Sequence, residues 1–249
     1  MEPIEVTYFG DETVDGPAVM VSGLPGIGQV GKVVVDHILH ELEVEKVAEI
    51  HSIYFPPQVV NQPDGTCRLV NNELWRYRSP SGTYLFLVGD SQSVSPEGHY
   101  RLAATYLDCA ERFGVERVYT LGGYGVGHLV DEPRVLSIVT HEALRPPVEE
   151  AGGTFEQGEP GSGIIGAAGL IIALGVRRGM EGICLMGETS GYLVDPKSAA
   201  AVLRVLCRLT DLGINRDRLQ GRAEDMEEAL EQVREFERVR QNDELSYIG

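Results

Sequence analysis

The sequence predicts an α/β fold with a mainly parallel sheet that is covered by helices on both faces. Two observations support this prediction. Short apolar segments typical of buried strands alternate along the chain with longer amphipathic segments typical of helices. Glycine-rich turns join many of these segments, as expected where strands are followed by crossover helices. With 249 residues, 43% of them hydrophobic, the chain is long enough to bury a substantial core.

The elements follow from local pattern and turn chemistry. The predicted strands cover residues 4–9, 17–22, 46–53, 67–70, 73–77, 83–88, 116–121, 134–140 and 182–186. The predicted helices cover about 28–42, 95–113, 161–176 and 196–212, and residues 141–151 form a helix or a turn. Segments 67–70 and 73–77 are expected to pair as a hairpin. Ser95 and Pro96 are typical of a helix N-cap and first turn.

The chain is predicted to divide into one α/β domain, residues 1–213, and a C-terminal helix and tail, residues 214–249. Between Arg222 and Arg240, apolar residues recur at helical spacing among many Glu and Arg residues. The apolar stripe consists of Met226, Ala229, Leu230, Val233, Phe236 and Val239. Such a helix is expected to pack on the core or on another subunit.

Composition excludes several classes of function. The formal charge of −17 argues against nucleic-acid and anionic-membrane binding, because phosphates would be repelled. No run approaches the roughly 18 apolar residues of a membrane span, and residues 1–5 do not begin a signal peptide. The four cysteines are far apart in sequence, so we expect reduced thiols in an acidic cytoplasmic protein without a zinc site.

The glycine-rich turn at residues 23–31 follows a strand and precedes a helix. Gly26, Gly28 and Gly31 fit the G-x-G-x-x-G pattern of dinucleotide-binding loops. One interpretation is that backbone N–H groups there hold a phosphate. The other is that glycine permits tight strand–helix corners. A second match, beginning at Gly161, and the absence of an acid at the end of the next strand favour tight corners. No cofactor is therefore predicted.

Polar residues at predicted strand ends form the second candidate site. Asp90 and Gln92 follow one strand, and Glu188 and Ser190 follow another. Ligands of open α/β sheets bind at such ends, and two carboxylates there would suit acid/base chemistry. The alternative is that these groups cap helices and fix loops by hydrogen bonds. No nucleophile with a histidine and an acid in a known order is present, so we assign no catalytic residue. The metal-binding pattern H-E-x-x-H is absent as well, so we assign no metal ligand.

Four motifs together resemble the archaeal branch of the proteasome-assembly-chaperone family. They are residues 22–31 (SGLPGIGQVG), 89–92 (GDSQ), 121–124 (LGGY) and 187–192 (GETSGY). The resemblance covers about residues 15–210. It implies a three-layer sandwich like that of nucleoside phosphorylases and a non-enzymatic homo-oligomer. It also implies binding to proteasome α subunits or the 20S particle, in assembly or capping. The alternative is a small-ligand binder or enzyme of nucleoside-phosphorylase or nucleotide-binding type.

The last residues bear on how such binding would occur. Some members of this system end in a hydrophobic residue, a tyrosine and one further residue, and this tail enters pockets between proteasome α subunits. Here the final residues are Leu245, Ser246, Tyr247, Ile248 and Gly249. The tyrosine is therefore displaced by one position and a serine occupies the hydrophobic position. Leu245, Tyr247, Ile248 and Gly249 are the docking candidates, and a flexible or subunit-packed tail is the alternative.

Overall fold

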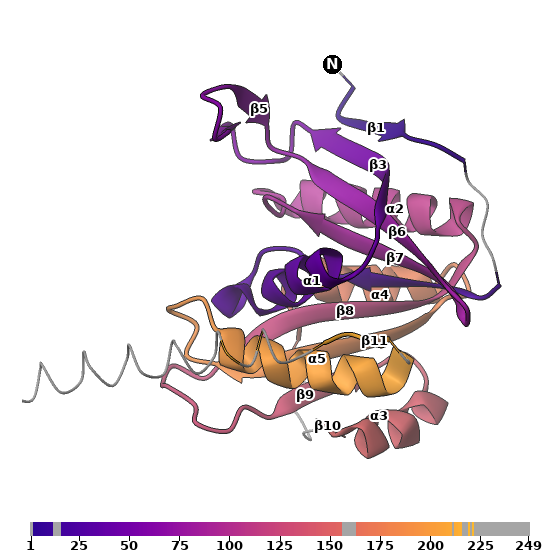
Figure 1. Cartoon of the computed structure of the whole chain (residues 1–249), viewed down its shortest axis with the longest axis vertical. Helices are drawn as coiled ribbons and strands as arrows, with labels where there is room; N and C mark the ends of the chain where they lie inside the picture. The colour runs from indigo at the N-terminus through magenta and orange to yellow at the C-terminus, as the bar shows by residue number, and fades with distance from the viewer. Residues whose placement is uncertain are drawn as a thin grey trace, which may run out of the picture.

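A computed structural model of the chain describes residues 2–11, 16–155, 163–210, 212–215, 219 and 221. Within these residues, nine strands form one sheet in the order β1-β3-β6-β7-β2-β8-β11-β9-β10 (Figure 1). These strands are β1 (Ile4–Tyr8), β2 (Ala18–Ser22), β3 (Glu45–Ser52), β6 (Asn72–Ser79), β7 (Gly82–Gly89), β8 (Val115–Gly125), β9 (Val135–Val139), β10 (Gly153–Thr154) and β11 (Glu181–Thr189). Strands β4 (Val59–Asn61) and β5 (Cys67–Leu69) pair separately.

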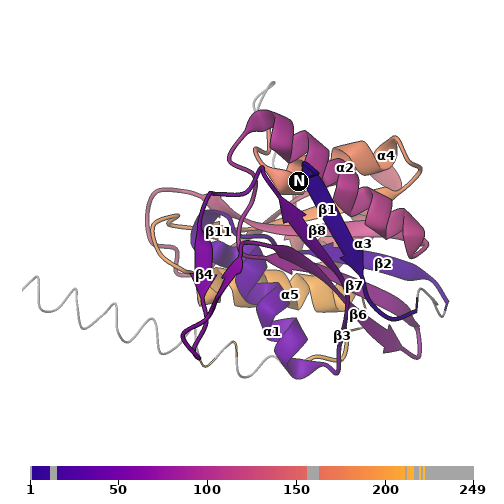
Figure 2. The same ribbon diagram turned by 90° about the horizontal axis from the view of Figure 1, so that it is seen from above.

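The helices cover both faces of the sheet, as predicted. They are α1 (Val30–Glu41), α2 (Pro96–Arg112), α3 (Arg145–Ala151), α4 (Ala167–Val176) and α5 (Pro196–Thr210), with short 3-10 helices η1 (Ile27–Gln29) and η2 (Glu142–Leu144). One apolar core joins α1, α3 and α5 to the sheet, and a second joins α2 and α4 to the other face. Figure 2 shows these three layers from above, with the sheet in the middle.

The sheet is parallel at its centre, mainly antiparallel towards its edges, and parallel again in the short edge pair of β9 and β10. Strands β7, β2, β8 and β11 run parallel to one another, whereas β1, β3 and β6 pair antiparallel on one side and β9 pairs antiparallel with β11 on the other. The prediction of a mainly parallel sheet therefore holds for the central strands. A short connection explains one of these antiparallel pairs, because the tight turn between β6 and β7 joins only antiparallel neighbours.

The predicted hairpin between residues 67–70 and 73–77 is wrong. Strand β5 pairs with β4, whereas β6 pairs with β3 and β7. Strand β4 follows Pro56 and Pro57 and was not predicted, because prolines interrupt strand patterns. In contrast, the start of α2 is confirmed, since the Ser95 hydroxyl accepts a hydrogen bond of 3.1 Å from the Gly98 N–H.

Two strands extend beyond their predicted ends at residues 121 and 186 into stretches that contain glycine. Strand β8 continues through residues 122–125, and β11 continues through residues 187–189. Close packing explains the glycines: a Cβ at Gly123 would lie 2.3 Å from the Ile27 carbonyl oxygen, and one at Gly187 would lie 2.2 Å from Ser198 Oγ. Glycine in these strands therefore allows other segments to pack directly against the sheet.

The region around the predicted domain boundary at residue 213 is partly described. Ile214 and Leu219 are buried in the same core as α1 and α5. His37 on α1 hydrogen-bonds the Asn215 carbonyl oxygen at 2.9 Å. Residues 222–249, with the predicted helix and the tail, lie outside the described residues, so the boundary stays a prediction. No helix in the described ranges is long and apolar enough to cross a membrane.

Candidate functional site

A groove of about 630 Å³ lies at the carboxyl ends of the central parallel strands. Loops after β2 and β7, the end of β8 and the start of α4 line it. Helix α1, which follows β2, packs on one face of the sheet, and α2, which follows β7, packs on the other. This divergence opens a crevice between neighbouring strands, the usual ligand position in open α/β sheets. Of the site residues predicted from the sequence, Gly26 and Gln92 line this groove.

The three glycines of the first turn serve different purposes. Gly28 has φ of +60°, and a Cβ there would lie 2.7 Å from Thr189 Oγ1. A Cβ at Gly31 would lie 2.3 Å from the Leu121 carbonyl oxygen. Only Gly26 has space, with Gln92 Nε2 as its nearest neighbour at 3.6 Å. Gly28 and Gly31 therefore permit the turn to pack against β11 and β8, which favours a tight corner over a phosphate loop.

Gln92 joins two loops across the groove. Its side-chain N–H donates to the Pro25 carbonyl oxygen at 2.7 Å, and its amide oxygen accepts from the Ala167 N–H at 2.9 Å. A Cβ at Gly166 would lie 3.0 Å from the same oxygen. Gln92 therefore caps the first turn of α4 and holds it against the glycine-rich turn.

Asp90 binds the β4–β5 hairpin to the body of the protein. Both of its oxygens accept hydrogen bonds from Arg68 on β5, one of them at 2.9 Å from Nη2, and the Asn71 N–H donates at 3.1 Å. Partial burial raises the pKa of the Asp90 carboxyl, but Arg68 and the Asn71 N–H outweigh it and lower the pKa. Asp90 is therefore an ionised anchor for this hairpin.

Glu188 anchors the loop between β8 and β9 through Arg134. Its side chain, only 8% exposed, pairs with the Arg134 guanidinium and accepts from the Arg134 N–H at 3.1 Å. These hydrogen bonds lower the pKa of the Glu188 carboxyl. Ser190, close by, is buried and its hydroxyl accepts from the Tyr192 N–H at 3.4 Å.

The geometry does not bring the two predicted carboxylates together. Asp90 follows β7 and Glu188 lies in β11, with β2 and β8 between them. Three strand spacings separate these positions by about 14 Å. Each carboxylate is ion-paired with a low pKa, whereas a general acid needs a pKa near the working pH. The arrangement therefore favours loop anchoring over acid/base chemistry.

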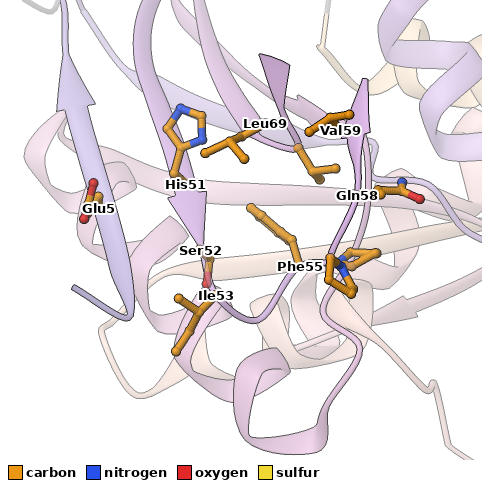
Figure 3. Close-up of a pocket in the computed structure, with 11 residues that line it drawn as sticks. Glu5, His51, Ser52, Ile53, Phe55, Gln58, Val59 and Leu69 are labelled. Atoms are coloured by element: carbon orange, nitrogen blue, oxygen red, sulfur yellow. The ribbon is translucent and has the colours of Figure 1, made fainter. Parts of the chain in front are cut away.

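A second cavity of about 580 Å³ lies between the ends of β1 and β3 and the β4–β5 hairpin (Figure 3). Phe55 is buried there, while Val59 and Leu69 point into the same space from the hairpin (Figure 3). His51 on the neighbouring strand hydrogen-bonds Glu49 at 2.7 Å. The Arg68–Asp90 contact thus also fixes one wall of this cavity, because Leu69 adjoins Arg68.

Sequence reasoning missed the two arginines that hold the site carboxylates. Arg68 was placed in a hairpin that does not form, and Arg134 stood at the start of a predicted strand. Neither position carries a local signal, since both ion pairs join residues far apart in sequence. The tail candidates Leu245, Tyr247, Ile248 and Gly249 lie outside the described residues.

Comparison with known proteins identifies the family. The model of the PAC2 family matches residues 20–234. The chain belongs to the PAC2 family. This confirms the resemblance to proteasome assembly chaperones that the four motifs indicated.

Two archaeal proteins are similar to this chain over most of its length. An uncharacterized protein of Methanocaldococcus jannaschii, MJ1210, is 39% identical over 241 residues, which cover 93% of this chain and 92% of the relative. The crystal structure of Pyrococcus furiosus PbaB, described as an archaeal proteasome activator, superposes with a TM-score of 0.87 at 36% identity, covering 94% of this chain and 100% of PbaB.

A more distant structure shares the fold. Pyrococcus furiosus PbaA, described as an archaeal homolog of proteasome-assembly chaperone, has a TM-score of 0.78 at 23% identity, covering 99% of this chain and 98% of PbaA. The PAC2 fold of this chain, with its mixed sheet and five helices, is therefore established in the part that the structure describes. The further likeness to nucleoside phosphorylases stays a prediction.

Proposed function

We propose that this PAC2 protein is a non-enzymatic, homo-oligomeric factor that binds the α subunits of the 20S proteasome and stimulates the particle. The observation that carries the proposal is the 36% identity with PbaB over 94% of this chain, at a TM-score of 0.87. PbaB is described as an activator. The identity with the assembly-chaperone homolog PbaA is 23%, which supports a common fold alone.

The geometry of the site supports binding rather than catalysis. Asp90 and Glu188 are each engaged by an arginine, and Gln92 uses both ends of its amide to hold loops. The groove is lined mainly by apolar side chains and backbone. A surface of this kind is suited to contacts with another protein. The function therefore concerns partner recognition.

The test uses purified archaeal 20S particles, a fluorogenic peptide and an unfolded protein substrate. We expect the full chain to raise the rate of hydrolysis severalfold and to co-elute with the particles. A variant that ends at residue 240 tests the tail, and Tyr247→Ala is compared with Ser246→Ala as its matched control. Absence of binding and stimulation by the full chain at several salt concentrations would contradict the proposal.

A second arm separates activation from assembly. Isolated α subunits are mixed with β subunits, and formation of complete particles is followed by native gels with and without the protein. Faster assembly without stimulation of mature particles would identify an assembly chaperone instead. Stimulation of mature particles without an effect on assembly is the result we expect.

The alternative function is small-ligand binding, which the groove beside Gly26 and Gln92 favours by its place at the carboxyl ends of the strands. Thermal-shift measurements with nucleosides, nucleotides and inorganic phosphate test it. Gly26→Val is the informative variant, because Gly26 has space for a side chain that would narrow the groove. A ligand-induced shift that this variant abolishes would support the alternative.

A further inference from the structure

Exposed apolar side chains gather at the carboxyl edge of the parallel strands. Ile165 is 98% exposed, Tyr192 is 79% exposed and Val94 is 65% exposed. We call the full set the apolar rim, and it consists of Ile27, Val94, Tyr124, Ile165, Tyr192, Leu193 and Val194. Ile27 lies in η1 and Tyr124 at the end of β8, whereas the other rim residues lie in loops that follow β7 and β11 or precede α4. Large apolar side chains this exposed require an explanation.

Observed proximities link five of the seven rim residues or their sequence neighbours, and Leu193 and Val194 follow Tyr192 in the sequence. Ile27, Val94 and Ile165 line the same groove. A Cβ at Gly191 would lie 3.4 Å from Ile27 Cγ2, and one at Gly125 would lie 3.5 Å from the same atom. The segments that carry Tyr124 and Tyr192 therefore contact Ile27. The loops after β8 and β11 extend to the same edge of the molecule in Figure 1.

The size of the apolar rim matches one side of a stable protein interface. Large side chains of this kind carry on the order of 150–250 Å² each when aromatic and somewhat less when aliphatic. With about half or more of each exposed, the seven residues present roughly 700–800 Å². A standard interface buries about 800 Å² on each partner. A typical monomer exposes contiguous apolar patches of only about 300–600 Å².

Charge indicates which face two copies of this chain can share. The chain carries 38 acidic residues and a net charge of −17, so two copies repel each other over most orientations. The seven rim residues include two tyrosines and no Asp, Glu, Lys, Arg or His. Among the described residues that line the adjoining groove, His99 is the titratable one. Two equally acidic molecules approach most closely through a surface without carboxylates.

We infer that the apolar rim is the surface through which one copy of this chain contacts a second copy, each contributing the same residues. Self-association is part of the proposed function, and the assignment of this face to it rests on that function. A contact of a face with itself is isologous and is generated by a two-fold axis. The rim residues and residues 241–249 of the tail are different parts of the sequence, so the two contacts are tested with different variants.

The experiment measures the mass of the full chain in solution by light scattering after size-exclusion chromatography. The wild-type chain is expected to have at least twice the monomer mass of 27.2 kDa at about 10 µM. The double variant Ile165→Glu with Tyr192→Glu places acidic groups on the two most exposed rim residues. It is expected to weaken self-association at least a hundredfold and to elute as a monomer.

The matched control is Leu69→Glu with Val176→Glu. Both residues are exposed, at 52% and 40%, and lie away from the rim, on β5 and at the end of α4. The control adds the same charge and is expected to keep the wild-type mass. Circular dichroism verifies the folding of both variants. If the rim variant does not fold, Ile165→Gln with Tyr192→Gln removes apolar surface without adding charge and is measured in the same way.

A wild-type chain that is monomeric at 100 µM, or a folded rim variant that keeps the wild-type mass, would overturn the assignment. Dissociation by the control variant alone would also overturn it and would place the contact near Leu69 or Val176 instead. Proteasome stimulation is measured in parallel. A monomeric rim variant combined with an inactive wild-type chain would support the rim contact while contradicting the proposed function.

Discussion

Gly31 is the position in the glycine-rich turn where one added methyl group should disturb the structure most. In Gly31→Ala, the new Cβ would lie 2.3 Å from the carbonyl oxygen of Leu121, 2.8 Å from its carbonyl carbon and 3.3 Å from its Cβ. Ordinary contacts begin near 3.4 Å. Because the nearest atoms are backbone atoms of a central strand, the first turn of α1 must move away from β8 by about 1 Å.

The expected loss of stability in Gly31→Ala follows from the packing that this shift of α1 weakens. Val30 and Val34 on the same helix are fully buried, so a shift of α1 weakens their packing. Overpacking of a core lowers the free energy of unfolding by about 1–3 kcal/mol. Because the backbones of both α1 and β8 are rigid, we expect a loss near the upper end of this range. Alanine regains about 1 kcal/mol through its higher helix propensity. The net loss is about 2 kcal/mol, or a decrease in Tm of roughly 4–8 °C.

Urea denaturation followed by circular dichroism measures the change at one fixed protein concentration. Gly26→Ala and Gly122→Ala are the matched controls, because their new Cβ atoms would meet nothing closer than 3.6 Å and 4.0 Å. Both are expected within about 0.5 kcal/mol of wild type. Equal stability of Gly31→Ala and Gly26→Ala would refute the close approach of α1 to β8.

The other predictions concern the groups that hold the loops. Glu188→Gln should cost about 1–2 kcal/mol at pH 7. The pKa of the Glu188 carboxyl lies below its usual 4.5, so its stabilising effect is complete above pH 4.5 and is lost as the pH falls through the lowered pKa. The free energies of unfolding of wild type and variant should therefore converge in acid. Arg68→Ala should free the β4–β5 hairpin from Asp90 and accelerate proteolysis at residues 62–66 severalfold, with little change in Tm; unchanged cleavage would contradict the anchoring role. Gln92→Leu should lower the free energy of unfolding by about 1–3 kcal/mol, because two backbone groups lose their partner.

Sequence reasoning located the central elements well, because their signals are local. The N-cap at Ser95, the buried run of β7 and the helical spacing after the first glycine-rich turn each depend on a few neighbouring residues. The pairing of β5 was wrong because strand partners depend on contacts that no short window contains. The same limit applies to the site: Asp90 and Glu188 were recognised as strand-end groups, but their arginine partners were not.

The sequence by itself determined the α/β class, the positions of the central strands and helices, and four motifs characteristic of the family. Those features follow from periodicity, turn chemistry and residue order. Only the tertiary structure decided what the motifs do. Gly28 and Gly31 allow a turn to pack directly against two strands. Asp90 and Glu188 each anchor a different loop, and the two positions lie about 14 Å apart. The apolar rim likewise appears only when segments from five places in the chain meet at one edge of the sheet, since exposure and proximity are properties of the folded chain.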